Sequence, residues 1–176
     1  MIQLHDLRFS PFISSATIRE RIVELGATLS AQYAGKQPVV LIIMKGAFMF
    51  GAELLKHFHP LCTIHFVKVQ SYTGTKSGAI ASFDGLPEGL TGSDVIIVED
   101  IIDSGNTVAF LLDKLAEVQP ASVYTVALLQ KEIPRAHYPS ADLVAFSIPD
   151  VFVVGYGLDY NQLGRNLPAI YQLTEK

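Results

Sequence analysis

The chain has 176 residues, 49% of them hydrophobic, which excludes a disordered chain and suits one domain with a substantial core. Its net charge of −4 argues against a nucleic-acid partner, and its longest uncharged run, 118–130, is too short to span a membrane. The single cysteine, Cys62, excludes an internal disulfide, and the first residues, 1–6, lack the pattern of a signal peptide, so a cytoplasmic protein is expected.

The N-terminal part predicts an arm and then a helix. Residues 1–16 mix aromatic and polar side chains around Pro11 and are expected to form an irregular arm or part of a small lobe. Thr17 and Glu20 have the spacing of a capping box, and Gly35 is a stop signal. Between them, one apolar stripe at helical spacing predicts the first helix: Ile18, Ile22, Leu25 and Leu29.

Two strands and a second helix are predicted next. The continuous apolar run 38–44 is typical of a buried strand, 47–57 of a helix, and 62–70 of another strand. Residues 71–86 are rich in Gly, Ser and Thr and have no apolar periodicity, which predicts a long loop. A loop of this size in a compact domain is usually functional.

The stretch 95–107 changes character halfway. It begins as a β-branched run, 95–98, which predicts a strand buried on both faces of a parallel sheet. Glu99, Asp100 and Asp103 follow, and the apolar spacing after residue 107 predicts a helix. A strand, a polar loop and a helix N-terminus therefore meet at the carboxyl edge of the sheet, where open α/β folds bind ligands.

The loop residues suit a phosphate and the acids suit a sugar. Gly105 allows a close approach of the backbone, Ser104 and Thr107 supply hydroxyl donors, and the first amides of a helix favour an anion. Carboxylates beside a phosphate would repel it unless hydroxyls or Mg²⁺ lie between them. Because neighbouring strand residues point to opposite faces, Glu99 and Asp100 are expected to have different roles.

Further short strands are predicted over 122–129, 143–146, 151–154 and 169–173. Their alternation with helices predicts an α/β fold with a mainly parallel central sheet flanked by helices, formed by a single domain, 1–176.

Two segments carry a resemblance to a known family. Residues 95–107 resemble the phosphoribosyl-pyrophosphate (PRPP) motif of type I phosphoribosyltransferases, in the form typical of hypoxanthine-guanine phosphoribosyltransferases. Residues 148–161 resemble the base-binding segment of the same family. The resemblance implies the type I fold with a small hood of terminal segments, PRPP and a 6-oxopurine base as substrates, Mg²⁺ as cofactor, and a homodimer or homotetramer.

The resemblance also implies roles on the phosphoribosyl side. Asp103 would be the general base at the purine imidazole nitrogen, and Glu99 and Asp100 would hold the ribose hydroxyls or support the metal. The 5′-phosphate would be bound by the loop residues Ser104, Gly105, Asn106 and Thr107. Asn106 departs from the lysine common in animal relatives, but amides and hydroxyls remain as donors.

The pyrophosphate and the lid are assigned in the same way. Lys45 and Gly46 match the family's pyrophosphate turn, in which the Met44–Lys45 bond would be cis, and Ala47 replaces its usual second glycine. Arg165 would also meet the pyrophosphate. The pair Ser71 and Tyr72 would begin a lid that keeps water from the reacting centre.

The base pocket follows from the same resemblance. Lys131 would donate to the purine 6-oxo group, which discriminates against adenine because its 6-amino group is also a donor. Phe152 would stack on the base, Val153 would read its edge through backbone groups, and Leu158 would line the pocket. Asp159 would reach Mg²⁺.

The implied reaction joins hypoxanthine or guanine to PRPP and releases pyrophosphate. Two alternatives stay open at this point: a xanthine- or uracil-type phosphoribosyltransferase, and a module that senses PRPP or nucleotide without turnover. Lys131 and the Phe152 segment favour 6-oxopurines, and Asp103 favours catalysis, because binding alone does not require that carboxylate.

Overall fold

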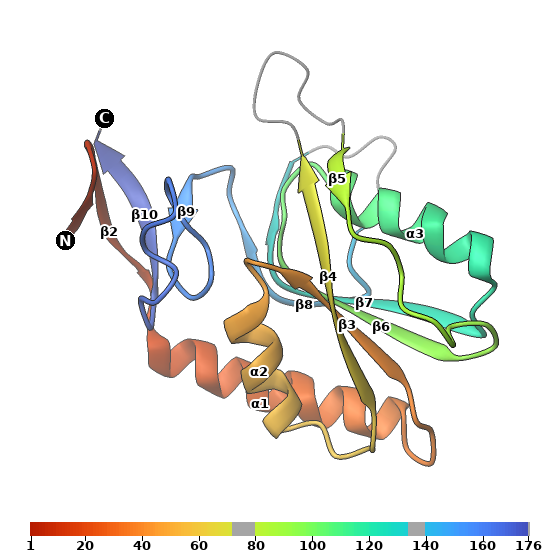
Figure 1. Cartoon of the computed structure of the whole chain (residues 1–176). Helices are drawn as coiled ribbons and strands as arrows, with labels where there is room; N and C mark the ends of the chain where they lie inside the picture. Colours follow the sequence, from red (N-terminus) through yellow and green to blue (C-terminus); the bar gives the residue numbers. More distant parts are fainter. Residues whose placement is uncertain (72–79, 134–139, 176) are drawn as a thin grey trace.

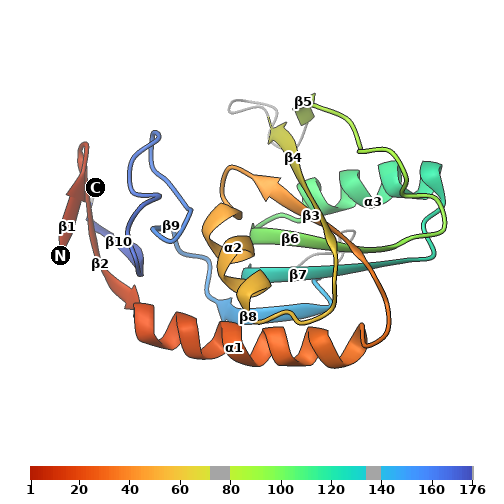
Figure 2. The same ribbon diagram turned by 60° about the horizontal axis from the view of Figure 1, so that its bottom comes forward.

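The computed structural model describes residues 1–71, 80–133 and 140–175 (Figure 1). Over these ranges the chain forms two sheets and three helices. The larger sheet has the strand order β5-β4-β3-β6-β7-β8, and the smaller one has the order β1-β2-β10-β9. The smaller sheet, here called the hood, lies at one end of the molecule beside the larger sheet (Figures 1 and 2).

The larger sheet is parallel except at β5, which confirms the predicted mainly parallel sheet. Its strands are β3 (Val39–Met44), β4 (Thr63–Ser71), β5 (Ile80–Phe83), β6 (Asp94–Ile102), β7 (Ser122–Lys131) and β8 (Leu143–Ile148). The prediction of an uninterrupted loop over 71–86 is wrong at β5. This strand has no apolar repeat of its own; it pairs with the end of β4, and its Phe83 ring packs edge-on against Phe110, 5.1 Å away.

Three helices cover the two faces of the sheet. Helices α1 (Ser15–Gln32) and α2 (Phe48–Lys56) lie on one face and α3 (Asn106–Val118) on the other (Figures 1 and 2). The predicted apolar stripe of α1 is buried against the sheet: Ile18, Ile22, Leu25 and Leu29. Its start was misplaced, because the Ser14 hydroxyl, not Thr17, caps the helix and accepts from the Thr17 amide at 3.1 Å. Thr17 is therefore the residue whose amide is capped.

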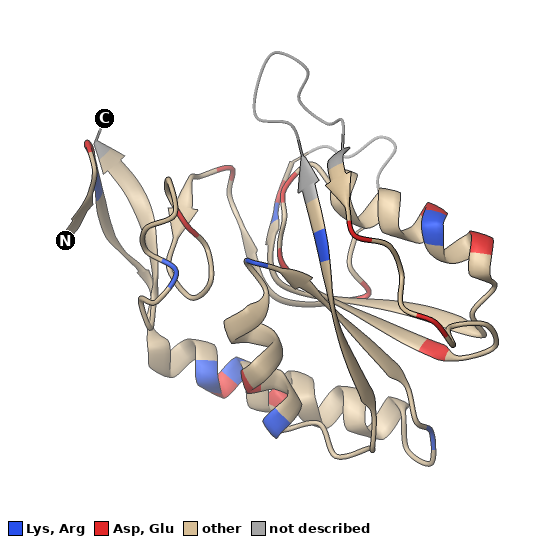
Figure 3. Ribbon diagram, viewed as in Figure 1, with Lys and Arg blue, Asp and Glu red and all other residues tan. Residues whose placement is uncertain are grey.

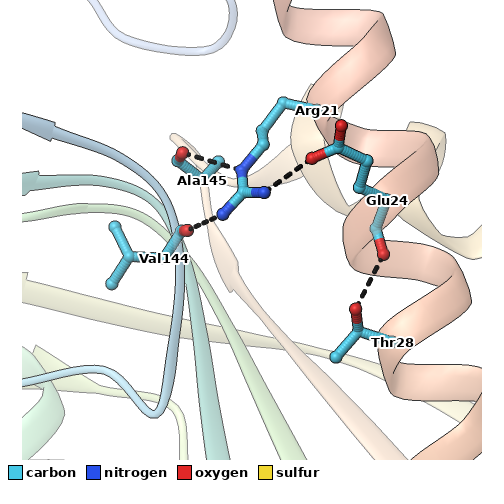
Figure 4. A network of polar contacts seen from close by, with 5 residues as sticks. All are labelled: Arg21, Glu24, Thr28, Val144 and Ala145. Atoms are coloured by element: carbon cyan, nitrogen blue, oxygen red, sulfur yellow. Dashed lines mark hydrogen bonds and ion pairs between the residues drawn. The ribbon is translucent and has the colours of Figure 1, made fainter.

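Arg21 ties α1 to the last strand of the sheet (Figure 4). Its Nε donates to the Ala145 carbonyl at 3.0 Å and its Nη2 to the Val144 carbonyl at 3.1 Å. The third nitrogen, Nη1, pairs with Glu24 one turn along the helix at 2.6 Å. One guanidinium thus satisfies carbonyls of β8 and fixes the helix over it.

The hood brings the two chain termini together. It consists of β1 (Ile2–Leu4), β2 (Leu7–Ile13), β9 (Val153–Val154) and β10 (Ile170–Glu175), all paired antiparallel. Most of residues 1–16 are regular strand, so of the two expectations for this segment the small lobe is confirmed and the irregular arm is wrong. Strand β9 is shorter than the predicted 151–154. The hood shares the buried cluster of α1 and α2 through Val153 of β9 and Ile170 of β10.

Charged residues of both signs alternate along the helices (Figure 3). Ion pairs three residues apart join Arg21 to Glu24, Lys56 to Glu53, and Lys114 to Glu117. No helix in the part of the chain that the structure describes is both long enough and apolar enough to cross a membrane.

Candidate active site

A small cavity lies at the carboxyl end of β6 and β7, under the segment that leads into the hood. Its volume is about 140 Å³, and it is lined by Asp100, Ile101, Asp103, Lys131, Val151, Phe152, Val153, Leu158 and Asp159. All of these except Ile101 and Val151 are residues predicted from the sequence. The cavity is smaller than the roughly 300–1,000 Å³ typical of sites for drug-sized ligands. Its size suits one flat ring system.

Lys131 joins two carboxylates at the edge of this cavity. Its Nζ lies 3.2 Å from Asp103 Oδ1 and 2.8 Å from Asp150 Oδ1, and only 11% of its side chain is exposed. Burial alone would lower the pKa of Lys131, but Asp150 and Asp103 outweigh it and raise the pKa. The side chain is therefore a charged donor at neutral pH.

The aromatic wall of the cavity is Phe152. Phe152 is 43% exposed, whereas Val153 and Leu158 beside it are buried. Val153 begins β9, and the Phe152 carbonyl accepts from the Leu173 amide of β10 at 2.9 Å. The hood strands thus fix the backbone at Phe152 and directly after it.

The loop after β6 exposes the start of α3. Gly105 is the N-cap residue, with φ of +88°, a left-handed conformation that favours glycine. The helix begins at Asn106, whose amide lies 3.5 Å from Ser104 Oγ. Ser104, Asn106 and Thr107 are at least partly exposed, so hydroxyls and helix N-terminal amides are available to an anion.

Glu99 and Asp100 have different surroundings. Glu99 is 5% exposed, does not line the cavity, and accepts from the Asp100 amide at 3.2 Å. Burial and the neighbouring Asp100 carboxylate raise the pKa of Glu99 well above its usual value. Asp100 faces the cavity and accepts from the Ile101 amide at 2.8 Å. Burial also raises the pKa of Asp100.

The turn after β3 packs directly on Asp100. The Met44–Lys45 bond is cis, as the resemblance implies, and Ala47 is accommodated as a buried residue at the start of α2. A Cβ at Gly46 would collide with the Asp100 carboxylate. A larger residue at this position would therefore displace the Asp100 carboxylate.

The same turn contacts residues 157–162 on both sides of Leu158. A Cβ at Gly157 would collide with the Gly46 carbonyl, and Lys45 Nζ donates to Gln162 Oε1 at 3.3 Å. Arg165 Nη1 donates to the Gly157 carbonyl at 2.7 Å. Lys45, Gly46 and Arg165, predicted together as pyrophosphate residues, are thus brought together around Gly157, beside the cavity but outside its lining.

Arg165 is also paired with the predicted metal ligand. Its Nη2 lies 2.5 Å from Asp159 Oδ1, and the other oxygen, Oδ2, accepts from the Gln162 amide at 2.7 Å. The buried Arg165 Nε has no hydrogen-bond partner within the described residues. This donor could serve an anion bound at the turn.

The carboxylates present suit Mg²⁺ shared with a substrate. Asp100 and Asp159 both line the cavity. Within the described ranges, no group of three His, Cys, Asp or Glu side chains could hold a metal ion by itself. Mg²⁺ typically keeps several waters and takes one or two carboxylates together with substrate phosphates. The residues therefore fit a substrate-bound Mg²⁺ rather than a metal held by protein alone.

The predicted lid begins at the limit of the structure. Ser71 is the last residue of β4 and its backbone pairs with Ile80, whereas Tyr72 lies outside the described residues.

Sequence reasoning missed the residues that support the site. Asp150 pairs with Lys131, Gln162 with Lys45, and Gly157 packs on Gly46. Asp150 lies within the segment that resembles the family's base-binding segment, so the carboxylate that follows Pro149 could have been identified as a candidate site residue from the sequence. No local pattern indicated the partner of Gln162, because Lys45 is more than 100 positions away in the chain.

The comparisons with known proteins agree with this geometry. The family model of the phosphoribosyl transferase domain matches residues 15–161, so the fold and the site define a phosphoribosyltransferase. The chain is 39% identical over 168 residues to the hypoxanthine-guanine phosphoribosyltransferase of Bacillus subtilis, covering 94% of this chain and 93% of that one. It is 42% identical over 166 residues to the enzyme of the same name from Streptococcus pneumoniae R6, covering 93% and 92%.

Solved structures give the same result. A hypoxanthine phosphoribosyltransferase from Staphylococcus aureus superposes with a TM-score of 0.86 at 37% identity, covering 96% of this chain and 92% of that one. Against the bifunctional protein TilS/HprT of Listeria innocua, identity is 43% over 160 residues, but the chain spans only 25% of that protein's length. The chain belongs to the hypoxanthine-guanine phosphoribosyltransferase family.

Proposed function

We propose that this chain is a purine-salvage enzyme that transfers the 5-phosphoribosyl group from PRPP to hypoxanthine or guanine, giving IMP or GMP and pyrophosphate. One observation carries the proposal: Asp103, Lys131 and Phe152 meet around a single cavity at the end of β6. An acceptor of protons, a charged donor and an aromatic face are the groups that a 6-oxopurine nucleophile needs. The names of the relatives support the same activity.

In this proposal, Phe152 stacks on the purine, Val153 reads its edge through the backbone, and Leu158 closes the pocket. Lys131 donates to the 6-oxo group; its ammonium is already at the cavity and stays charged. Asp103 takes the proton from the imidazole nitrogen as the bond to the sugar forms. A carboxylate suffices for this step because the proton becomes more acidic as charge develops on the ring.

The phosphoribosyl group occupies the adjoining loop. Ser104, Gly105, Asn106 and Thr107 bind the 5′-phosphate through hydroxyls and the N-terminal amides of α3. The carboxylate of Asp100 is placed to accept from ribose hydroxyls, and buried Glu99 holds the Asp100 backbone. These contacts fix the sugar between the leaving pyrophosphate and the incoming base.

The leaving group lies at the turn after β3, where Lys45, Gly46 and Arg165 converge around Gly157. Asp159 would hold Mg²⁺ in exchange for its pair with Arg165, which would free that guanidinium for the pyrophosphate. Asp100 is a better second carboxylate than Glu99, because Glu99 does not line the cavity. When bound, Mg²⁺ neutralises charge on the pyrophosphate oxygens. Lys45 and Arg165 supply the remaining positive charge.

The proposal has four further parts. Residues 1–176 act as one domain, supported by the buried cluster that the hood shares with α1 and α2. The segment from Ser71 and Tyr72 acts as the lid. The protein is a homodimer or homotetramer, and it acts in the cytoplasm.

The test is nucleotide formation from PRPP and Mg²⁺, with hypoxanthine, guanine, xanthine, adenine and uracil compared in parallel. We expect turnover of hypoxanthine or guanine and none of adenine. Turnover of xanthine or uracil alone would support the assigned PRPP-binding residues and overturn the assignment of hypoxanthine or guanine as the base. PRPP binding with no turnover of any base would identify a sensor instead.

A further inference from the structure

Phe152 is the centre of a cluster of three aromatic rings. Its ring centroid lies 6.1 Å from that of Phe9 on β2 and 5.9 Å from that of Tyr160, which stands nearly perpendicular at 85°. Phe9 and Tyr160 also lie 6.4 Å apart, so the three rings close a triangle. Edge-to-face contacts of this kind are favourable beyond the area that they bury. The triangle is here called the ring triad.

The ring triad is fixed by the turn at the N-terminal end of the hood. The Tyr160 hydroxyl donates to Asp6 Oδ1 at 2.9 Å, and the Tyr160 ring meets the His5 ring edge-on at 5.6 Å. His5 Nε2 lies 3.3 Å from the Asn161 carbonyl. His5 and Asp6 form the two-residue turn between β1 and β2. The first turn of the chain therefore holds a residue more than 150 positions away.

We propose that Tyr160 is a positioning residue, held by the His5–Asp6 turn, which sets the Phe152 ring for stacking on the purine base. The inference rests on the proposed function, since it takes Phe152 as the stacking surface. Phe152 is 43% exposed and lines the cavity, so the sheet core alone does not confine its ring. Contacts from Phe9 and Tyr160 confine the ring before the base arrives, which lowers the entropy lost on binding.

The test compares Michaelis constants for the two substrates. Tyr160→Leu removes the ring and the hydroxyl, and it should raise the KM for hypoxanthine about tenfold, the scale of one to two aromatic contacts. The KM for PRPP should stay near the parent value, because among the described residues the ring contacts of the triad and the hydrogen bond of its Tyr160 go to Phe9, Phe152, His5 and Asp6, not to the phosphate loop 104–107. Tyr160→Phe keeps the ring and should restore most of the base affinity.

Asp6→Ala gives an independent test from the other side of the hydrogen bond. It should reproduce the small effect of Tyr160→Phe, and it remains informative if Tyr160→Leu does not fold. Tyr171→Leu is the matched control: it removes a tyrosine of the same hood sheet that lies outside the ring triad, and it should leave both constants unchanged.

An unchanged KM for hypoxanthine in Tyr160→Leu would overturn the inference. An equal rise in the KM for PRPP would also overturn it, because Tyr160 would then act on the whole 159–165 segment rather than on Phe152. Failure of the proposed function shows separately, in the parent protein alone, as no nucleotide from hypoxanthine or guanine.

Discussion

Lys131 lies between two carboxylates, and in the proposed reaction this arrangement would link base recognition to base activation. Its ammonium is 3.2 Å from Asp103 and 2.8 Å from Asp150. When Lys131 donates to a 6-oxo group, its ammonium would contact both the substrate and Asp103. Asp103 would then lie beside the purine ring from which it takes a proton. A 6-amino group in the same position would face a charged donor with a donor of its own. In the proposed reaction, the residue that selects the base would therefore also hold the general base in place.

Replacing Asp103 with Asn tests the role of the carboxylate. Without a proton acceptor, kcat should fall by about 10²–10⁴-fold, the usual range for general base catalysis. The KM for PRPP should change little, because the 104–107 loop is intact. Steady-state kinetics measure both values. Asp150→Asn is the matched control, since it removes the other partner of Lys131 but leaves Asp103, and its kcat should fall far less. Equal losses in the two variants would contradict the assignment.

The phosphoribosyl half of the candidate site was predictable because its residues are local. Glu99 to Thr107 form one continuous stretch whose residue types are unusual directly after a buried strand. Their supporting residues were not predictable. Asp150 and Gln162 act through contacts with Lys131 and Lys45, which only the fold brings near.

Elements were predictable where an apolar period fixes them. The stripe of α1 is buried as expected, but its first turn was shifted because Ser14 and Thr17 are both good N-caps by residue type. Strand β5 has no period at all. It exists because the end of β4 offers a free edge and Phe110 offers a ring for Phe83.

Arg21 provides a test at this scale, because it holds α1 against β8 through two carbonyls. Arg21→Lys replaces a fork of donors by one ammonium and should lower the free energy of unfolding by about 1–2 kcal/mol, measured by urea denaturation. Glu24→Gln leaves both hydrogen bonds from Arg21 to the β8 carbonyls in place. It should lower the free energy of unfolding by less than about 0.5 kcal/mol, since the Arg21–Glu24 pair is exposed. If Glu24→Gln were as costly as Arg21→Lys, the carbonyl bonds would not be the source of the stability.

At the scale of the whole molecule, the hood was predictable only through the family resemblance. Residues 1–16 show no strong strand pattern, since Pro11 lies within β2. The main partner of β2 is β10, at the other end of the chain. Such pairing joins segments about 160 positions apart. Sequence periodicity reports nothing about it.

The stability of the fold should fall at high pH. Burial, with Asp94 nearby, raises the pKa of Tyr33 to about 12, and burial raises that of Tyr156 to about 12. Both phenols ionise near 10 in the unfolded chain. The two neutral phenols therefore contribute their full stabilisation of the folded state below pH 10. This contribution is lost as the pH rises from 10 toward 12.

Tyr33→Phe should reduce this alkaline loss by on the order of 1–2 kcal/mol, because phenylalanine has no proton to lose. Urea midpoints at pH 8, 10 and 11 measure the effect. Tyr171→Phe, at a half-buried hood position, should retain the full parental loss. The same pH dependence in Tyr33→Phe as in the parent would contradict the role of Tyr33.

The most direct test of the account is the ratio of kcat/KM for hypoxanthine to that for adenine, measured in the parent and in Lys131→Gln. A glutamine amide can donate or accept, so it should accept from a 6-amino group where lysine cannot. Effects of the variant on Asp103 apply to both bases and cancel in the ratio. We predict a parental ratio of about 10⁴ or more and at least a tenfold fall in Lys131→Gln. An unchanged ratio would show that Lys131 does not read the 6-position, and would contradict the placement of the base in this cavity.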